Sequence, residues 1–340
     1  MNKSEIEDIT NQSGLSVEIN NFNNFYSKIA DVKSQIGKQV FGQENTIDLC
    51  LCAILAGAHA LLIGMPGLAK TSLVAAISQS LGQDFKRIQF TPDLMPNDIL
   101  GSEILDTDKD GNRNFRFVKG PIFTQILMAD EINRASPKTQ SALLEAMQEG
   151  RVTIAGNSME LPKPFHVLAT QNPIEHEGAY PLPEAQLDRF LLQIDVPYPD
   201  EATERKILIE TTKAIENHIS EPLAQNDLIE IQKIVRDLPI SERLLETTIA
   251  LVRNLRPETS NIDFVKENVE WGPGPRAGQA LILASKARAF LRGRTAPTLA
   301  DLQFVAYSAL CHRISLKWGA RNSGKDLNDL ISDIFDKFGA

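Results

Sequence analysis

A short stretch of the chain combines residue types that bind phosphate. Residues 64–71 read GMPGLAKT, which follows the phosphate-loop pattern G-x-x-x-x-G-K-[S/T] except for Ala69 at the second glycine. In such a loop the backbone amides converge on phosphate oxygens, Lys70 would reach the outer phosphates, and the Thr71 hydroxyl would ligate magnesium. The pattern therefore predicts a nucleotide-binding loop. The expected contacts are Gly64, Pro66, Gly67, Leu68, Ala69, Lys70, Thr71 and Ser72.

The methyl group of Ala69 is compatible with this loop. An anion-binding turn alternates right-handed and left-handed residues, and a left-handed alanine costs about 1–2 kcal/mol. Several charge-assisted hydrogen bonds to phosphate, roughly 1.5–3 kcal/mol each, outweigh that cost. We therefore predict a positive φ at Ala69. The alternative is a plain glycine-proline turn, but Lys70 in a first helical turn opposes the helix dipole unless an anion is bound there.

Polar residues follow two further apolar runs. ILMADE delivers Asp130 and Glu131 at the end of a predicted strand, and HVLATQNP delivers Asn172 at the end of another. Phosphoryl transfer needs compensated charge and an oriented water. We expect Asp130 to hold magnesium with Thr71, Glu131 to polarise the attacking water, and Asn172 to orient it. The alternatives are an acidic pair that caps a turn and ordinary Asn-Pro turn chemistry.

Two arginines in the second half of the chain are candidates for contact with an anion. Arg189 lies in EAQLDRF just before a predicted strand, where a surface salt bridge with Asp188 or Glu184 is the alternative. Arg276 lies in GPGPRAG. Pro275 suits the first position of a helix, so Arg276 falls in a first turn, where a cation is disfavoured without a nearby anion.

The predicted secondary structure that carries these residues alternates between strand and helix up to about residue 199. Helical spacing is predicted from Phe25 to Ile36, from Gln43 to Ala56, from Thr71 to Leu81 and from Pro137 to Gln148. The strand-like runs lack strict alternation, as expected for strands covered on both faces of a parallel sheet. These runs are HALLI at 59–63, RIQF at 87–90, QILMAD at 125–130, HVLAT at 166–170 and FLLQIDV at 190–196.

Helical periodicity alone continues after PYPDE at 197–201. The predicted organisation is a flexible tail over residues 1–20, an α/β domain over 21–198, and an all-helical domain over 199–340. Within the α/β domain, residues 98–121 contain DTDKDGN between short apolar runs, which predicts a β-hairpin. The same letters resemble the start of a calcium loop. The glutamate that such a loop requires is replaced by Phe117, so calcium is rejected.

Composition limits the function classes. The 340 residues carry a formal net charge of −9, which argues against binding of nucleic acid driven by phosphate neutralisation. The first twenty residues do not form a secretory signal, and no apolar run reaches the length of a membrane span. Cys50, Cys52 and Cys311 suggest no disulfide framework and are expected to be small buried hydrophobes. A cytoplasmic location fits these features.

These blocks, in this order, resemble the AAA+ ATPases, and their wording is similar to the MoxR family in particular. The blocks are GMPGLAKT, FTPDLMPNDILG, ADEINRASPKTQSALLEAMQEG, ATQNPIEHEGAYPLPEAQLDRF and GPGPRA. The similarity runs from about VFGQ at 40 to about residue 310. That resemblance implies an α/β P-loop sheet with a hairpin insertion, followed by a small all-helical lid. It also implies that ATP and Mg²⁺ are the bound species, and alanine is common in this family at position 69.

The resemblance also implies roles for individual residues. Arg189 would act in trans, in the site of an adjoining subunit, whereas Arg276 would act in cis from the lid and report on the γ-phosphate. Arg134 is a further candidate for a subunit interface, and the hairpin at 98–121 would face the axis of a ring. The residues expected to line the adenine pocket are Val40, Phe41, Gly42 and Gln43.

The expected protein is thus a ring-forming ATPase, of hexameric type, that remodels or matures a partner protein. In this family the partner often contains a von Willebrand A domain. The sequence leaves open the ATPase motor of a metal chelatase and a nucleotide-sensing module without turnover. A DNA-translocating motor is disfavoured by the negative net charge, and Arg113, Arg116 and Lys119 of the hairpin are its only support.

Overall fold

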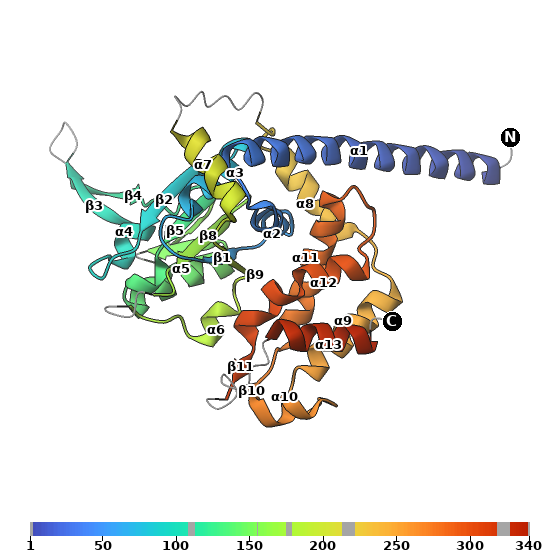
Figure 1. Ribbon diagram of the computed structural model, residues 1–340. Coiled ribbons are helices and arrows are strands. Elements are labelled where there is room, and N and C mark those ends of the chain that lie inside the picture. The colour runs from blue at the N-terminus through green and yellow to red at the C-terminus, as the bar shows by residue number, and fades with distance from the viewer. Residues whose placement is uncertain are drawn as a thin grey trace.

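A five-stranded parallel sheet forms the centre of the computed structural model (Figure 1). The structure describes residues 3–107, 113–154, 156–174, 179–212, 222–317 and 327–338. The strand order is β2-β5-β8-β1-β9, and every neighbouring pair is parallel. The strands are β1 (Ala60–Ile63), β2 (Phe85–Gln89), β5 (Ile126–Asp130), β8 (His166–Gln171) and β9 (Leu192–Asp195). All five overlap the predicted runs, so the predicted α/β fold with a parallel sheet is confirmed.

Both faces of this sheet are buried, which explains the continuous apolar runs. Successive residues of one strand enter different cores: Leu127 of β5 faces one and Met128 the other, and both are fully buried. The core behind Leu127 includes α4 (Pro96–Leu100) and α5 (Pro137–Glu149). The core on the Met128 side includes α2 (Glu44–Leu55), which precedes β1, and α3 (Lys70–Ser80), which follows it. Helices of the C-terminal half also contribute to this core. A strand covered on both faces loses the polar alternation that marks a half-exposed one.

Helices connect the strands, and in α5 the residues that set both helix ends can be identified. The Ser136 hydroxyl accepts a hydrogen bond from the Thr139 amide at 3.4 Å, Pro137 occupies the first turn, and the helix ends at Gly150 with φ 64°. The remaining helices of this half are α1 (Lys3–Gln39), α2 (Glu44–Leu55), α3 (Lys70–Ser80), α6 (Glu184–Leu187) and α7 (Glu201–Thr211), with the 3₁₀ turn η1 (Ile132–Arg134).

Two antiparallel hairpins extend the sheet domain. The predicted hairpin is present as β3 (Gly101–Thr107) paired with β4 (Arg113–Lys119). Its turn at 108–112, which includes part of the rejected calcium loop, lies outside the described residues. A second hairpin, β6 (Arg151–Ile154) with β7 (Asn157–Glu160), was not predicted. Its strands are four residues long, too short for a clear period-2 signal.

The C-terminal half is helical with one small exception. Its helices are α8 (Asp227–Asp237), α9 (Glu242–Asn254), α10 (Asp263–Asn268), α11 (Pro275–Leu291), α12 (Leu299–Leu310), the 3₁₀ turn η2 (Cys311–Arg313) and α13 (Leu327–Phe338). The expectation of a purely helical lid misses the antiparallel pair of β10 (Val269–Trp271) and β11 (Ser315–Leu316). These strands are too short to give a pattern in the sequence. One hydrophobic core joins this half to the sheet, and α11 packs on α2.

The N-terminal segment differs from the expected tail. The structure has a single helix, α1, from Lys3 to Gln39, where we expected an irregular tail followed by a helix near Phe25. The stretch contains no proline, so nothing in it stops a helix that is already nucleated downstream. Figure 1 shows α1 extending well beyond the other elements.

Candidate functional site

The predicted phosphate loop connects β1 to α3, as its motif requires. Gly67 and Ala69 both have left-handed backbones, with φ of 84° and 55°, so the positive φ predicted for Ala69 is confirmed. Lys70 begins α3, and its Nζ donates to the backbone carbonyls of Gly64 and Met65, the latter at 2.9 Å. The amine therefore lies over the loop. This alternation of backbone handedness is the geometry that turns amides toward an anion.

The strand order brings the other predicted residues to the same edge of the sheet. Asn172 follows β8, and Asp130 and Glu131 lie at the end of β5; β8 is paired with β1 on one side and with β5 on the other. Strands are about 4.8 Å apart, so Asp130 lies about 10 Å across the sheet from the loop, with Asn172 between them. Because all three strands are parallel, their carboxyl ends meet at one edge, which we call the carboxyl edge.

Asp130 is held by residues that sequence reasoning missed. Its side chain is buried, and it accepts hydrogen bonds from the Thr170 hydroxyl and from Arg87, whose Nη2 lies 2.6 Å from Oδ2. Arg87 comes from β2, the strand paired with β5. These contacts fix the carboxylate at the strand end. Within RIQF, the polar Arg87 in a predicted strand was the one signal that could have indicated this contact.

Glu131 has an unusual backbone and a defined side-chain position. Its φ is 55°, in the left-handed region that is uncommon for residues other than glycine. Its carboxylate accepts a hydrogen bond from Gln89 at 2.7 Å and pairs with Arg134 at 2.9 Å, and its amide donates to Thr170. The suggested interface residue Arg134 therefore lies against Glu131 within its own chain.

The segment predicted to line the adenine pocket lies beside the phosphate loop. Gln43 donates its side-chain amide to the Leu68 carbonyl at 3.0 Å. Gly42 has a φ of 69°, and any side chain there would collide with Thr203 of α7. The residues from Val40 to Gln43 thus contact both the loop and the helix after β9. Their role toward adenine remains a prediction.

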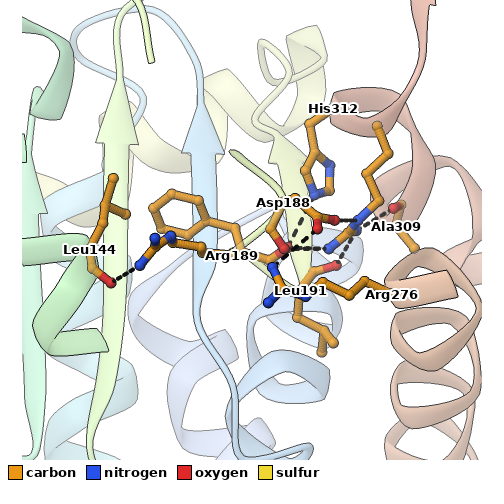
Figure 2. Close-up of polar contacts among 9 residues, drawn as sticks. Leu144, Asp188, Arg189, Leu191, Arg276, Ala309 and His312 are labelled. Carbon is orange, nitrogen blue, oxygen red and sulfur yellow. Dashed lines mark hydrogen bonds and ion pairs between the residues drawn. The ribbon is translucent and has the colours of Figure 1, made fainter. Parts of the chain in front are cut away.

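Arg189 lies at the opposite edge of the sheet, where the strands begin, which we call the amino edge. It precedes β9, just as His59 precedes β1, whereas the phosphate loop follows β1. Strand β1 has four residues, so the two edges are about 13 Å apart. Arg189 donates to the Leu144 carbonyl of α5 at 2.8 Å and forms neither of the salt bridges considered as alternatives. Figure 2 shows its guanidinium reaching toward Leu144, away from Asp188.

The expectation for Arg276 must be corrected. A cis role was expected, which requires Arg276 to lie near Lys70 and Asp130 of its own chain, but Arg276 pairs with Asp188 at 3.4 Å, at the amino edge. It lines a cavity of about 200 Å³ with Asp188 and Arg189. The reason is tertiary: α11 packs on α2, and this docking carries its first turn to the start of β9 rather than to the phosphate loop. A cis contact between Arg276 and nucleotide bound at the loop does not fit this geometry.

Comparisons with known proteins identify the family of this chain. Residues 59–192 match the ATPase family associated with various cellular activities (AAA), and residues 263–334 match the AAA lid domain. The chain is 41% identical to the uncharacterized protein YeaC of Bacillus subtilis, covering 88% of this chain and 90% of that one. It is 40% identical to the chaperone MoxR1 of Mycobacterium tuberculosis, covering 84% of this chain and 75% of the relative.

A solved structure extends the likeness to the whole fold. A protein of Cytophaga hutchinsonii that is provisionally named an ATPase superposes with a TM-score of 0.88 at 39% identity, covering 95% of this chain and 98% of that one. The fold and the loop define an AAA+ ATPase with a helical lid. The chain belongs to the MoxR family of these ATPases. Among the described residues, no helix combines the length and apolar character needed to cross a bilayer.

Proposed function

We propose that this protein hydrolyses ATP at the boundary between adjoining subunits of a ring, which we take to be a hexamer. The observation that carries the proposal is the separation of two charged groups to opposite edges of one sheet. Lys70 and Glu131 lie at the carboxyl edge, whereas Arg189 and Arg276 lie together at the amino edge. One chain cannot bring both groups to the same phosphate, but a head-to-tail neighbour can.

The carboxyl edge supplies the groups that bind and position the substrate. Amides of the loop and the amine of Lys70 would neutralise the phosphates, and Glu131 would accept a proton from the attacking water while Asn172 orients it. Gln89 and Arg134 hold the Glu131 carboxylate in place through the contacts given above. The left-handed backbone of Glu131 is the kind of local strain that accumulates at functional sites.

Magnesium would arrive with the nucleotide. Thr71 and Asp130 are the two protein groups available, and Mg²⁺ is commonly bound by one or two protein oxygens together with substrate phosphates and water. Oδ1 of Asp130 accepts one hydrogen bond, from Thr170, and keeps a further lone pair, whereas Oδ2 accepts two from Arg87. Within the described residues no group of three or more His, Cys, Asp and Glu could hold a metal alone.

The amino edge would supply the arginines that complete the neighbouring site. An arginine fork stays charged and grips phosphate oxygens in pairs, which stabilises charge that develops in the transition state. We retain the trans role predicted for Arg189 and extend it to Arg276, which shares the same cavity.

We further propose that turnover remodels a partner protein, of which a von Willebrand A domain protein is the leading candidate. Two features support a protein client. The relative MoxR1 is named a chaperone. The β3–β4 hairpin exposes an apolar cross-strand pair, Leu105 and Phe115, whose side chains are 52% and 74% exposed. Such an exposed apolar pair is typical of an interaction surface.

Removal of Arg189 tests the proposal. Arg189→Ala should bind a fluorescent ATP analogue as tightly as the unaltered protein, because the phosphate loop lies at the other edge. Phosphate release should fall by about 10³-fold or more, which is the usual contribution of an arginine supplied in trans. Arg253→Ala, an exposed arginine of α9, is the matched control and should retain full turnover. In the unaltered protein, turnover per subunit should rise with protein concentration; equal turnover at dilute and assembled concentrations would contradict the proposal.

A further inference from the structure

A buried arginine of the lid binds the segment that carries Arg189. Arg313 ends η2, and only 3% of its side chain is exposed. Its Nε donates to the Asp188 carboxylate at 2.7 Å. Its two terminal nitrogens donate to the carbonyls of Asp188, Phe190, Leu191 and Ala309, at 3.2, 2.7, 3.1 and 2.5 Å respectively.

These contacts hold the chain on both sides of Arg189. The carbonyl before it and the two carbonyls after it all accept from Arg313. His312 adds a hydrogen bond from Nε2 to the Phe190 carbonyl at 3.1 Å. Burial and the neighbouring Arg313 charge lower the pKa of His312 to about 3, so the ring stays neutral and keeps this role. Figure 2 shows the segment between Leu144 on one side and Ala309 on the other.

Asp188 connects the same arginine to Arg276. One carboxylate oxygen of Asp188 accepts from Arg313 and the other faces Arg276 at 3.4 Å. Arg313 is buried, whereas the Arg276 side chain is 57% exposed at the cavity. The carboxylate therefore compensates the buried charge and at the same time sets the direction of the exposed one.

We propose that Arg313 is a positioning residue that fixes both arginines offered to the neighbouring subunit, Arg189 through its backbone and Arg276 through Asp188. The inference rests on the proposed function, because it concerns the same site between subunits. Arg313 itself reaches no nucleotide: it is buried in the lid against the amino edge. A planar fork with five donors suits this task, because its N–H groups match in number the four carbonyls and the one carboxylate oxygen that accept from it.

Kinetics on Arg313→Met test the positioning role. We expect kcat of the assembled protein to fall about 100-fold, the cost of misplacing a catalytic group by about 1 Å, with KM for ATP within about twofold of the unaltered value. Arg313→Lys keeps the charge but loses the fork, and its kcat should lie between that of Arg313→Met and that of the unaltered protein. The matched control is Arg294→Met, because Arg294 is another lid arginine with a buried carboxylate partner, Asp301, and does not contact residues 188–191. Its kcat should be unchanged.

Mixed assemblies separate misplacement from misfolding. A Glu131→Gln subunit cannot activate water but carries intact arginines, whereas an Arg313→Met subunit has an intact site but misplaced arginines. In randomly mixed rings about a quarter of the boundaries join an intact site to intact arginines. The mixture should therefore turn over faster than either variant alone. No gain on mixing would overturn the inference.

The proposed function and this inference can fail separately. Full turnover by Arg189→Ala would reject the site between subunits. Loss of turnover in Arg189→Ala together with wild-type turnover in Arg313→Met would reject only the positioning role. Where Arg313→Met does not fold by circular dichroism, Asp188→Asn replaces it: the amide oxygen still accepts from Arg313, but the charge that directs Arg276 is lost. Its kcat should fall at unchanged KM, and an unchanged kcat would reject the inference.

Discussion

Two residues at the nucleotide site have backbones that their side chains disfavour. Among the described residues, Ala69 and Glu131 are the non-glycine residues with positive φ. Such a conformation costs about 1–2 kcal/mol for each. At Ala69 this conformation allows the loop amides to converge on a phosphate, and each hydrogen bond to phosphate contributes roughly 1.5–3 kcal/mol. The strain is local, and it lies at the two positions where the proposed chemistry needs fixed groups.

Glu131→Gln should separate nucleotide binding from hydrolysis. The amide keeps the oxygen that accepts from Gln89 but cannot take a proton from water, so turnover should fall by about 10²–10⁴-fold. ATP should remain bound, as followed with a fluorescent analogue, while phosphate release is measured in parallel. Glu149→Gln at the exposed end of α5 serves as control. Hydrolysis retained in Glu131→Gln would mean that another group activates the water.

The same variant can be used to find the partner protein. A client that stays bound to ATP-locked Glu131→Gln, and that the unaltered protein releases, would identify the partner.

At the scale of elements, a buried charge cluster ties the lid to the sheet domain. Asp48 of α2 is 2% exposed and pairs with Lys33 of α1 at 2.5 Å, with Arg288 of α11, and with Arg292 at 3.6 Å. The Arg288 guanidinium also lies 3.7 Å from the centre of the Phe304 ring. One carboxylate thus joins the consecutive helices α1 and α2 to α11, whose Arg288 is 240 residues away from Asp48. This cluster fixes how α11 docks, and hence the edge at which Arg276 lies.

Loss of this carboxylate should destabilise the whole domain. Asp48→Ala leaves the buried guanidinium of Arg288 without its carboxylate partner, and breaking a buried pair in this way costs about 3–5 kcal/mol. The free energy of unfolding, measured by urea denaturation, should fall by that amount. Asp263→Ala is the control, because Asp263 pairs with Lys266 but its side chain is 88% exposed, so the loss there should stay below about 1 kcal/mol. Equal losses in the two variants would show that Asp48 does not tie the elements together.

At the scale of the whole molecule, the two edges of the sheet have separate tasks. The carboxyl edge carries the phosphate loop and the acidic pair, and the lid docks so that its arginines join Arg189 at the amino edge. In Figure 1, α6 and α7, which flank β9, lie at opposite edges of the sheet. A molecule built in this way presents half of a site on each side. Assembly is therefore part of the proposed mechanism.

The amino edge should also make stability depend on pH. Burial lowers the pKa of His59 and of His166 to about 4, and that of His312 to about 3, from the ordinary value of 6.5. As pH falls below 6.5, these histidines become protonated in the unfolded chain but stay neutral in the folded chain. Each histidine should therefore remove about 1.4 kcal/mol of stability per pH unit over the window from 6.5 to 4.

Unfolding free energies measured at pH 7.0 and pH 5.5 would check this expectation. His166→Gln should lose less stability over the interval than the unaltered chain, because glutamine can still donate to the Ala58 carbonyl but does not titrate. Equal stability at the two pH values would contradict the depressed pKa values.

Much of the sheet domain followed from local pattern. The five strands, α3, α5 and the β3–β4 hairpin were predicted, because apolar runs, turn residues and caps act over a few positions. The left-handed Ala69 followed from the needs of an anion-binding loop. The β6–β7 hairpin and the β10–β11 pair were missed because their strands are too short to show a period, and the length of α1 was missed because a polar sequence gives little sign of continuing a helix.

The groups that this protein has for phosphate chemistry, and the strand end that carries each of them, were already evident from the order of its residues. The position of Arg276 at the amino edge, and the binding of Arg313 to a segment more than a hundred residues away, became visible in the folded chain alone. This difference arises because local preferences and tertiary packing act over different distances along the sequence. Steric and hydrogen-bonding preferences fix a loop or strand from neighbouring residues, whereas the docking of α11 and α12 depends on the sum of many contacts among residues that no local pattern relates.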